Sequence, residues 1–198
     1  MNQPMEESLR EEFDAAPNGQ APAADARGYS AADVEKISLR NGWLAGELDA
    51  AGNAELQAWL ERAAMLLGGQ VKNSVELEDM LRLVFVYEAG RTLEAGENQD
   101  VLMREGAREV IRELANRVLD GVAIDSDRFK EIVEELKGAT PYRSRELFQP
   151  IRVALAGRAG GGELDRVILL LDAGAKLKFA TPVKGARQRI IEFCAAFE

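Results

Sequence analysis

The chain has 198 residues and a formal net charge of −9, and 46% of its residues are apolar, so it can bury the core of one medium-sized domain or of two small ones. It contains no histidine and one cysteine, Cys194, which excludes Ser-His and Cys-His nucleophile pairs, imidazole zinc sites and an internal disulfide framework. No stretch approaches the ~20 apolar residues that a membrane span requires.

Residues 1–30 are rich in Ala, Pro and acidic residues, and they hold too few large apolar side chains to offset the entropy of ordering. A disordered acidic tail is therefore expected. The alternative is a short helix over Met5–Phe13 that acts as a docking segment. Because the tail lacks the basic and apolar parts of a signal peptide, a cytoplasmic protein is expected.

Apolar residues recur at helical spacing after the tail. Ser30 and Asp33 match a capping box, which predicts that a helix starts there. A second helix is predicted from Asn53 to Leu67, with Trp59 on its apolar stripe and therefore in the core; stacking of Trp59 on a base is the alternative. Two further helices are predicted over residues 74–87 and 100–119.

The stretch LRLVFVY, residues 81–87, also has the β-branched and aromatic composition of a strand. Residues 76–82 have helical spacing, however, and no partner strand is evident. A helix is therefore the favoured interpretation.

The last third of the chain predicts four more helices. Asp125 or Ser126 starts the first of them, which ends at Gly138. Thr140 is predicted to cap the next, which begins at Pro141 and ends at Gly157 in a left-handed conformation. The remaining two helices are predicted over residues 164–174 and from Pro182 onward.

No strand alternation and no repeat period is present. The sequence therefore predicts an all-α fold, a helical bundle or cage of about eight or nine helices. We expect the acidic tail to be followed by a helical subdomain over residues 31–120 and a basic helical subdomain over residues 121–198.

The sequence offers no clear catalytic group. The segment GRAGGGELDR, residues 157–166, lacks the Gly-Lys-Ser/Thr ending of a phosphate-binding loop and does not follow a strand. Adjacent acids such as Glu134 and Glu135 diverge on a helix, which does not suit shared acid–base chemistry. No metal-ligand spacing is present. We therefore predict no catalytic residue, no cofactor and no metal.

Positive charge is concentrated near the C-terminal end. From Arg143 to Arg189 the chain has ten Lys and Arg against four Asp and Glu, whereas the remainder has fifteen against thirty. The basic end is expected to contact a polyanion, although solvated helix faces would explain the charge equally well. Arginine can pair with phosphate or stack on unpaired bases. The candidate RNA-binding residues are Arg143, Arg145, Arg152, Arg158, Lys176 and Lys178.

The segment RELFQPIRVALAG, residues 145–157, resembles a segment of bacterial-type glutamyl-tRNA synthetases with the form K-x-L-F-x-P-L-R-V-A-L-T-G. That segment lies in the C-terminal helical, anticodon-binding region of the family. Ala156 stands where the family usually has Thr, and Gly161-Gly162 replaces a common Gly-Pro. Arg152 matches the arginine of the motif.

A second segment, residues 32–41, is similar to the F-D-x-x-K-L-x-W-x-N element that opens the helical region of the same family. Asp33, Lys36 and Asn41 match this pattern. An alternative alignment matches residues 36–40 to a decayed K-M-S-K-S loop, but Leu39 would then replace the central lysine.

The resemblance implies a tRNA-binding module that contacts the anticodon stem and loop. We expect a free-standing relative of this region, which acts alone, with a separate catalytic synthetase subunit or with another protein, away from membranes. Class I synthetases need an H-x-G-H signature, which a chain without histidine cannot supply, so ligase activity is not expected of this chain by itself. The alternative is a helical protein-interaction module that kept the scaffold and lost RNA binding.

Overall fold

The computed structural model describes residues 28–46 and 53–197, and these residues form helices joined by turns, with no strand among them. The all-α prediction is thus confirmed. The helices are α2 (Ala31–Arg40), α3 (Ala54–Gly68), α4 (Ser74–Phe85), α5 (Ala89–Glu94), α6 (Gly96–Leu102), α7 (Ala107–Asp120), α8 (Ser126–Ala139), α9 (Ser144–Ala156), α10 (Glu163–Gly174) and α11 (Ala186–Phe197). Residues 1–27 of the predicted tail, and with them the predicted Met5–Phe13 helix, lie outside the described residues, whereas Tyr29 packs against the core and Ser30 caps α2.

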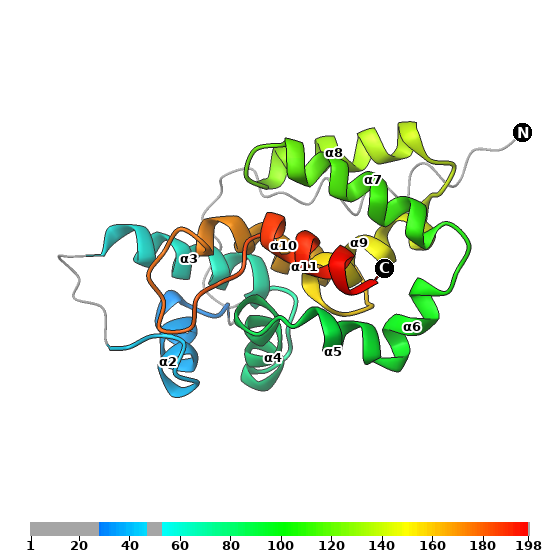
Figure 1. Ribbon diagram of the computed structural model, residues 1–198. Helices are drawn as coiled ribbons and strands as arrows, with labels where there is room; N and C mark the ends of the chain where they lie inside the picture. The colour runs from blue at the N-terminus through cyan, green and yellow to red at the C-terminus, as the bar shows by residue number, and fades with distance from the viewer. Residues whose placement is uncertain (1–27, 47–52, 198) are drawn as a thin grey trace, which may run out of the picture.

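Helices α9 and α10 occupy the centre of the arrangement (Figure 1). Helix α10 packs against α3, α4 and α9, whereas α9 packs against α7, and α11 packs against α5, α7 and α9. Helix α8 runs beside α7. The buried apolar side chains of these helices form one cluster that extends from Val34 to Phe193.

An aromatic group joins the first helices to the segment after α10. The rings of Trp43 and Phe85 stack with centroids 4.7 Å apart, and the Phe179 ring lies 5.0 Å from both Trp59 and Phe85. Trp59 is 3% exposed, and its indole N–H donates to the Leu170 carbonyl at 3.2 Å. The predicted core position of Trp59 is confirmed.

Several helix ends follow the local sequence. Ser30 and Asp33 form the predicted capping box of α2, Asp125 accepts from the first turn of α8, and Gly157 ends α9 at φ 84°. The segment 81–87 belongs to α4 as far as Phe85, so the strand alternative is wrong.

Two predicted helix starts are wrong. Helix α9 begins at Ser144 rather than Pro141, because the Thr140 hydroxyl donates to the Leu136 carbonyl and closes α8 instead. The last helix begins at Ala186 rather than Pro182, because Asp172 accepts the Ala186 N–H at 2.7 Å and fixes the first turn there.

The predicted helix over residues 100–119 is in fact two helices, α6 and α7. They are separated at Gly106, whose φ is 86°. The ring of Tyr142 occupies the space where a Cβ at this position would lie, 2.1 Å from its Cζ. A side chain thirty-six residues away therefore sets the break between α6 and α7. Because of this break and the short helix α5, the described residues contain more helices than the predicted eight or nine.

No described helix has the length and apolar character to cross a membrane. The division into subdomains over residues 31–120 and 121–198 stays a prediction.

Candidate nucleic-acid interface

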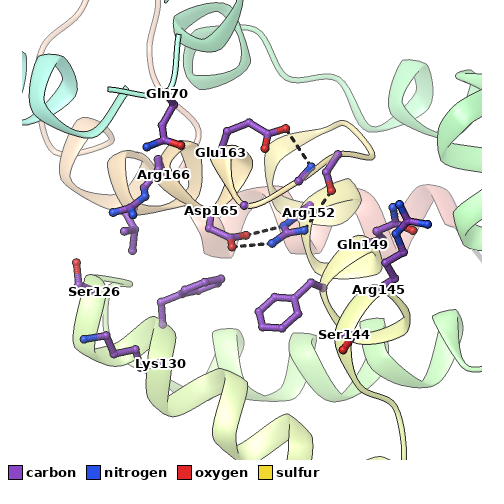
Figure 2. Close-up of a pocket in the computed structure, with 16 residues that line it drawn as sticks. Gln70, Ser126, Lys130, Ser144, Arg145, Gln149, Arg152, Glu163, Asp165 and Arg166 are labelled. Atoms are coloured by element: carbon purple, nitrogen blue, oxygen red, sulfur yellow. Dashed lines mark hydrogen bonds and ion pairs between the residues drawn. The ribbon is translucent and has the colours of Figure 1, made fainter. Parts of the chain in front are cut away.

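A cavity of about 780 Å³ opens between α8, α9 and the start of α10. We call it the basic cavity. In Figure 2, Ser126 and Lys130 lie on one side, Ser144, Arg145 and Gln149 on another, and Gln70 and Arg166 on a third, with Arg152 and Asp165 between them. Its apolar wall consists of Phe129, Phe148 and Leu169. A volume of this order is typical of a site for a small organic group.

Arg152 and Asp165 form a bidentate ion pair at the centre of the cavity. The Arg152 Nε and Nη2 donate to the two Asp165 carboxylate oxygens at 2.8 Å each, and both side chains are almost buried. Burial raises the pKa of the Asp165 carboxyl above its ordinary value, and the Arg152 guanidinium opposes this shift. A fork-to-fork pair of this kind fixes orientation as well as charge.

Arg152 also holds the turn between α9 and α10. Its Nη1 donates to the Gly160 carbonyl at 3.1 Å, and its guanidinium carbon lies 5.2 Å from the centre of the Phe148 ring. The arginine therefore connects the middle of α9, the turn and the first turn of α10.

Asn98 of α6 also holds this turn, and its side chain is 1% exposed. Its amide donates to the Gly157 carbonyl at 3.1 Å and to the Thr92 carbonyl at 2.8 Å. Its carbonyl oxygen accepts the Ala159 N–H at 2.7 Å. Its partners lie in α5 and in the α9–α10 turn, which is far from Asn98 in the sequence, so no local pattern identified Asn98.

The remaining cations of the basic cavity have few partners. Within the described part of the chain, Arg145 and Arg166 take part in no salt bridge, and Lys130 lies 4.0 Å from the Asp127 carboxylate on its own helix. The cavity's other acid, Glu163, accepts the N–H of Gly161 at 3.0 Å. Since Arg152 and Asp165 neutralise each other, the cavity keeps a positive excess.

The structure brings two of the six candidate RNA-binding residues, Arg145 and Arg152, to the basic cavity. Arg143 precedes α9, and its guanidinium donates to the carbonyl of Lys137 in the last turn of α8 and to those of Thr140 and Tyr142 after it. Arg158 follows α9, and its Nη2 lies 3.7 Å from the Met80 sulfur.

Lys176 and Lys178 follow α10 and are exposed. Lys176 lines a second hollow, between α10, α11 and the α7–α8 connection. Neither lysine lines the basic cavity. The roles of all six residues in RNA binding remain predictions.

Sequence reasoning missed Lys130 and Arg166 as candidates. Arg166 lies in the second turn of α10, inside the basic stretch 143–189, so the local charge balance was a signal for it. Lys130 lies upstream of that stretch on α8 and had no such signal. No group of three or more His, Cys, Asp or Glu side chains suited to a metal ion occurs among the described residues.

Comparison with known proteins gives one family match. A family model described as an anticodon binding domain matches residues 35–177. The chain is 30% identical over 144 residues to the glutamate–tRNA ligase of Oceanobacillus iheyensis, 29% over 142 residues to that of Bacillus thuringiensis and 28% over 138 residues to that of Bacillus subtilis.

These alignments cover 71%, 70% and 70% of this chain, and 29%, 28% and 28% of the three ligases. The chain thus spans less than a third of the length of these relatives. No solved structure matches it. The resemblance indicated by residues 145–157 is confirmed by the family match.

Proposed function

We propose a tRNA-binding function from one premise, which is that this chain belongs to the anticodon binding domain family over residues 35–177. The ligand that we propose is the anticodon stem and loop of a tRNA, with the tRNA for glutamate as the first candidate because the curated relatives are named glutamate–tRNA ligases. The observation that carries the proposal is the basic cavity, where Arg145 and Arg166 form no salt bridge within the described residues.

The chemistry of the cavity suits a single-stranded RNA loop. Guanidinium groups such as those of Arg145 and Arg166 can pair with phosphate oxygens in a bidentate manner. Unstacked bases of a loop need an apolar or aromatic surface, and Phe148 and Leu169 line the cavity. We assign Arg152 a positioning role, since its guanidinium already binds Asp165 and Gly160.

We propose further that these 198 residues hold no aminoacylation site. An H-x-G-H signature needs two histidines, and the sequence has none. The proposal concerns this chain alone and leaves catalysis to other residues or another polypeptide.

Binding of a fluorescent anticodon stem-loop tests the RNA function. We expect micromolar or tighter affinity at ~50 mM salt, and a steep loss of affinity by ~200 mM salt, because phosphate contacts release counterions. Arg145→Ala and Arg166→Ala should each weaken binding about tenfold at low salt and reduce the salt slope by about 1. The matched control is Arg91→Ala, an exposed arginine on α5 outside the cavity, which should change affinity less than twofold.

The second candidate function is the helical protein-interaction module. The observation that favours it is the charge outside residues 143–189, fifteen basic against thirty acidic residues. If the stem-loop and a total tRNA pool both fail to bind at ~50 mM salt, the RNA proposal is wrong and this second candidate stands.

A further inference from the structure

An acidic segment precedes the described residues in the same chain. Residues 5–14, MEESLREEFD, contain five acidic residues and one arginine. Met5, Leu9 and Phe13 recur at four-residue spacing, which is the pattern of one apolar helix face. The segment therefore combines apolar and acidic groups, whereas the cavity combines the apolar Phe129, Phe148 and Leu169 with cations.

The chain enters its described part beside the rim of this cavity. Tyr29 packs against the end of α3, where a Cβ on Gly68 would lie 3.3 Å from the Tyr29 Cβ. Gln70, two residues after Gly68, lines the basic cavity, and Figure 2 shows it on the same side as Arg166. Residue 28 is therefore close to the cavity that the acidic segment would have to reach.

The connection between the segment and Tyr29 is long enough. Fourteen residues, 15–28, separate Asp14 from Tyr29, and a chain of this length spans up to about 46 Å when extended. A short tether of this kind keeps a segment at an effective concentration in the millimolar range. Even weak complementarity would then be enough to populate a docked state.

We propose that residues 5–14 dock in the basic cavity of the same molecule. The apolar face of the segment packs against Phe129, Phe148 and Leu169, and its carboxylates lie against Lys130, Arg145 and Arg166. The docked segment presents negative charge where a phosphate backbone would bind. If the proposed RNA function is correct, the segment competes with RNA for the same cations.

The second hollow, of about 660 Å³, does not fit the same segment. Its charged lining residues are Lys176 and Arg187 against Asp172 and Glu192, so it has no positive excess to attract five acids. Charge thus favours the basic cavity over this second hollow as the docking site.

A spin label tests the docking directly in the full chain. The label is attached to Ala15→Cys in a Cys194→Ser background, just beyond the segment. We expect the backbone amide NMR signals of Lys130, Arg145 and Arg166 to lose more than half of their intensity relative to the reduced label. Glu6→Gln, Glu7→Gln, Glu11→Gln and Glu12→Gln, combined in one variant, should restore these signals.

Asp25→Asn is the control for this measurement, because it removes an acid outside the segment and should leave the signal loss unchanged. If the amide signals of Lys130, Arg145 and Arg166 are equally intense in the labelled chain with the native segment and in the labelled four-glutamine variant, the docking proposal is overturned.

A second measurement separates docking from RNA binding. The four-glutamine variant should bind the anticodon stem-loop about fivefold more tightly than the native chain at ~50 mM salt, because the docked state no longer reduces the competent fraction. A matched variant with Glu88→Gln, Glu94→Gln, Glu97→Gln and Asp100→Asn removes the same charge elsewhere and should change affinity less than twofold.

The outcomes of the two measurements distinguish the proposals. Signal loss at the cavity without RNA binding by any variant would refute the RNA function and keep the docking. If both four-residue variants bind RNA more tightly by the same factor, the gain is an effect of net charge, and the proposed competition between the segment and RNA is overturned.

Discussion

Arg189 is the largest side chain that is fully buried in the described residues, and no salt bridge among them includes it. Its guanidinium donates instead to three backbone carbonyls, those of Lys184 at 2.9 Å, Leu155 at 2.8 Å and Val84 at 2.6 Å. It also lies 4.6 Å from the centre of the Tyr87 ring. The buried charge therefore has partners, although none is a carboxylate.

Two of these carbonyls belong to the last turns of α4 and α9. Carbonyls in a last turn have no partner within their helix, and the helix macrodipole places partial negative charge there. The two helix ends thus compensate the positive charge. Burial lowers the pKa of Arg189 to about 10, so the side chain stays charged at neutral pH.

Arg189→Met should destabilise the protein by about 3 kcal/mol, because it leaves buried carbonyls at two helix ends without donors. Urea unfolding measures this free energy. Arg187→Met is the matched control, since Arg187 is exposed on the same helix and donates to the single Leu119 carbonyl; it should cost less than about 1 kcal/mol. Equal losses of unfolding free energy in the two variants would show that the carbonyl contacts of Arg189 do not stabilise the fold more than the single contact of Arg187.

At the scale of elements, two glycines with positive φ mark the ends of helices for different reasons. Gly106 precedes α7 at φ 86°, and a Cβ there would lie 2.1 Å from the Tyr142 ring. Gly157 follows α9 at φ 84°, and the nearest atoms to its Cβ would be 3.4 Å away. Both need the left-handed conformation, but only Gly106 also needs the absence of a side chain.

Gly157→Ala should cost about 1 to 2 kcal/mol, the strain of a left-handed residue with a Cβ. Gly106→Ala should cost more, because the Tyr142 ring must also move. In a Tyr142→Ala background the cost of Gly106→Ala should fall to about that of Gly157→Ala. A double-mutant cycle by urea unfolding measures the coupling, and additive losses would mean that the ring does not set the α6–α7 break.

The helices were largely predictable, because an apolar stripe at helical spacing depends on local sequence alone. Their ends were predictable only where the cap is local, as at Ser30 and Gly157. The start of α11 depends on Asp172, and the break before α7 depends on Tyr142. Such tertiary contacts leave no mark in a sequence window.

The candidate site was predictable to the extent that it lies on one helix. Arg145 and Arg152 were identified from the α9 segment, and both line the basic cavity. The pairing of Arg152 with Asp165 depends on how the turn brings α10 back against α9. Lys130 enters from α8, and the packing of three helices cannot be read from the spacing within any one of them.

At the scale of the whole molecule, helices from the two sides of the predicted boundary at residue 120 pack against each other. Helix α10 packs against α3 and α4, and α11 packs against α5 and α7. Phe179 is 8% exposed and contacts both Trp59 and Phe85. The two proposed subdomains thus bury apolar surface against each other, and their division can be tested by their cooperativity.

Tryptophan fluorescence and far-UV circular dichroism should report the same urea midpoint. Both tryptophans, Trp43 and Trp59, lie in residues 31–120, whereas circular dichroism reports helices of both parts. Phe179→Ala should lower both midpoints equally and cost about 3 kcal/mol, because one packed core unfolds as a unit. If the fluorescence midpoint alone moves, or the native midpoints differ, residues 31–120 and 121–198 unfold separately and the predicted boundary separates two folding units.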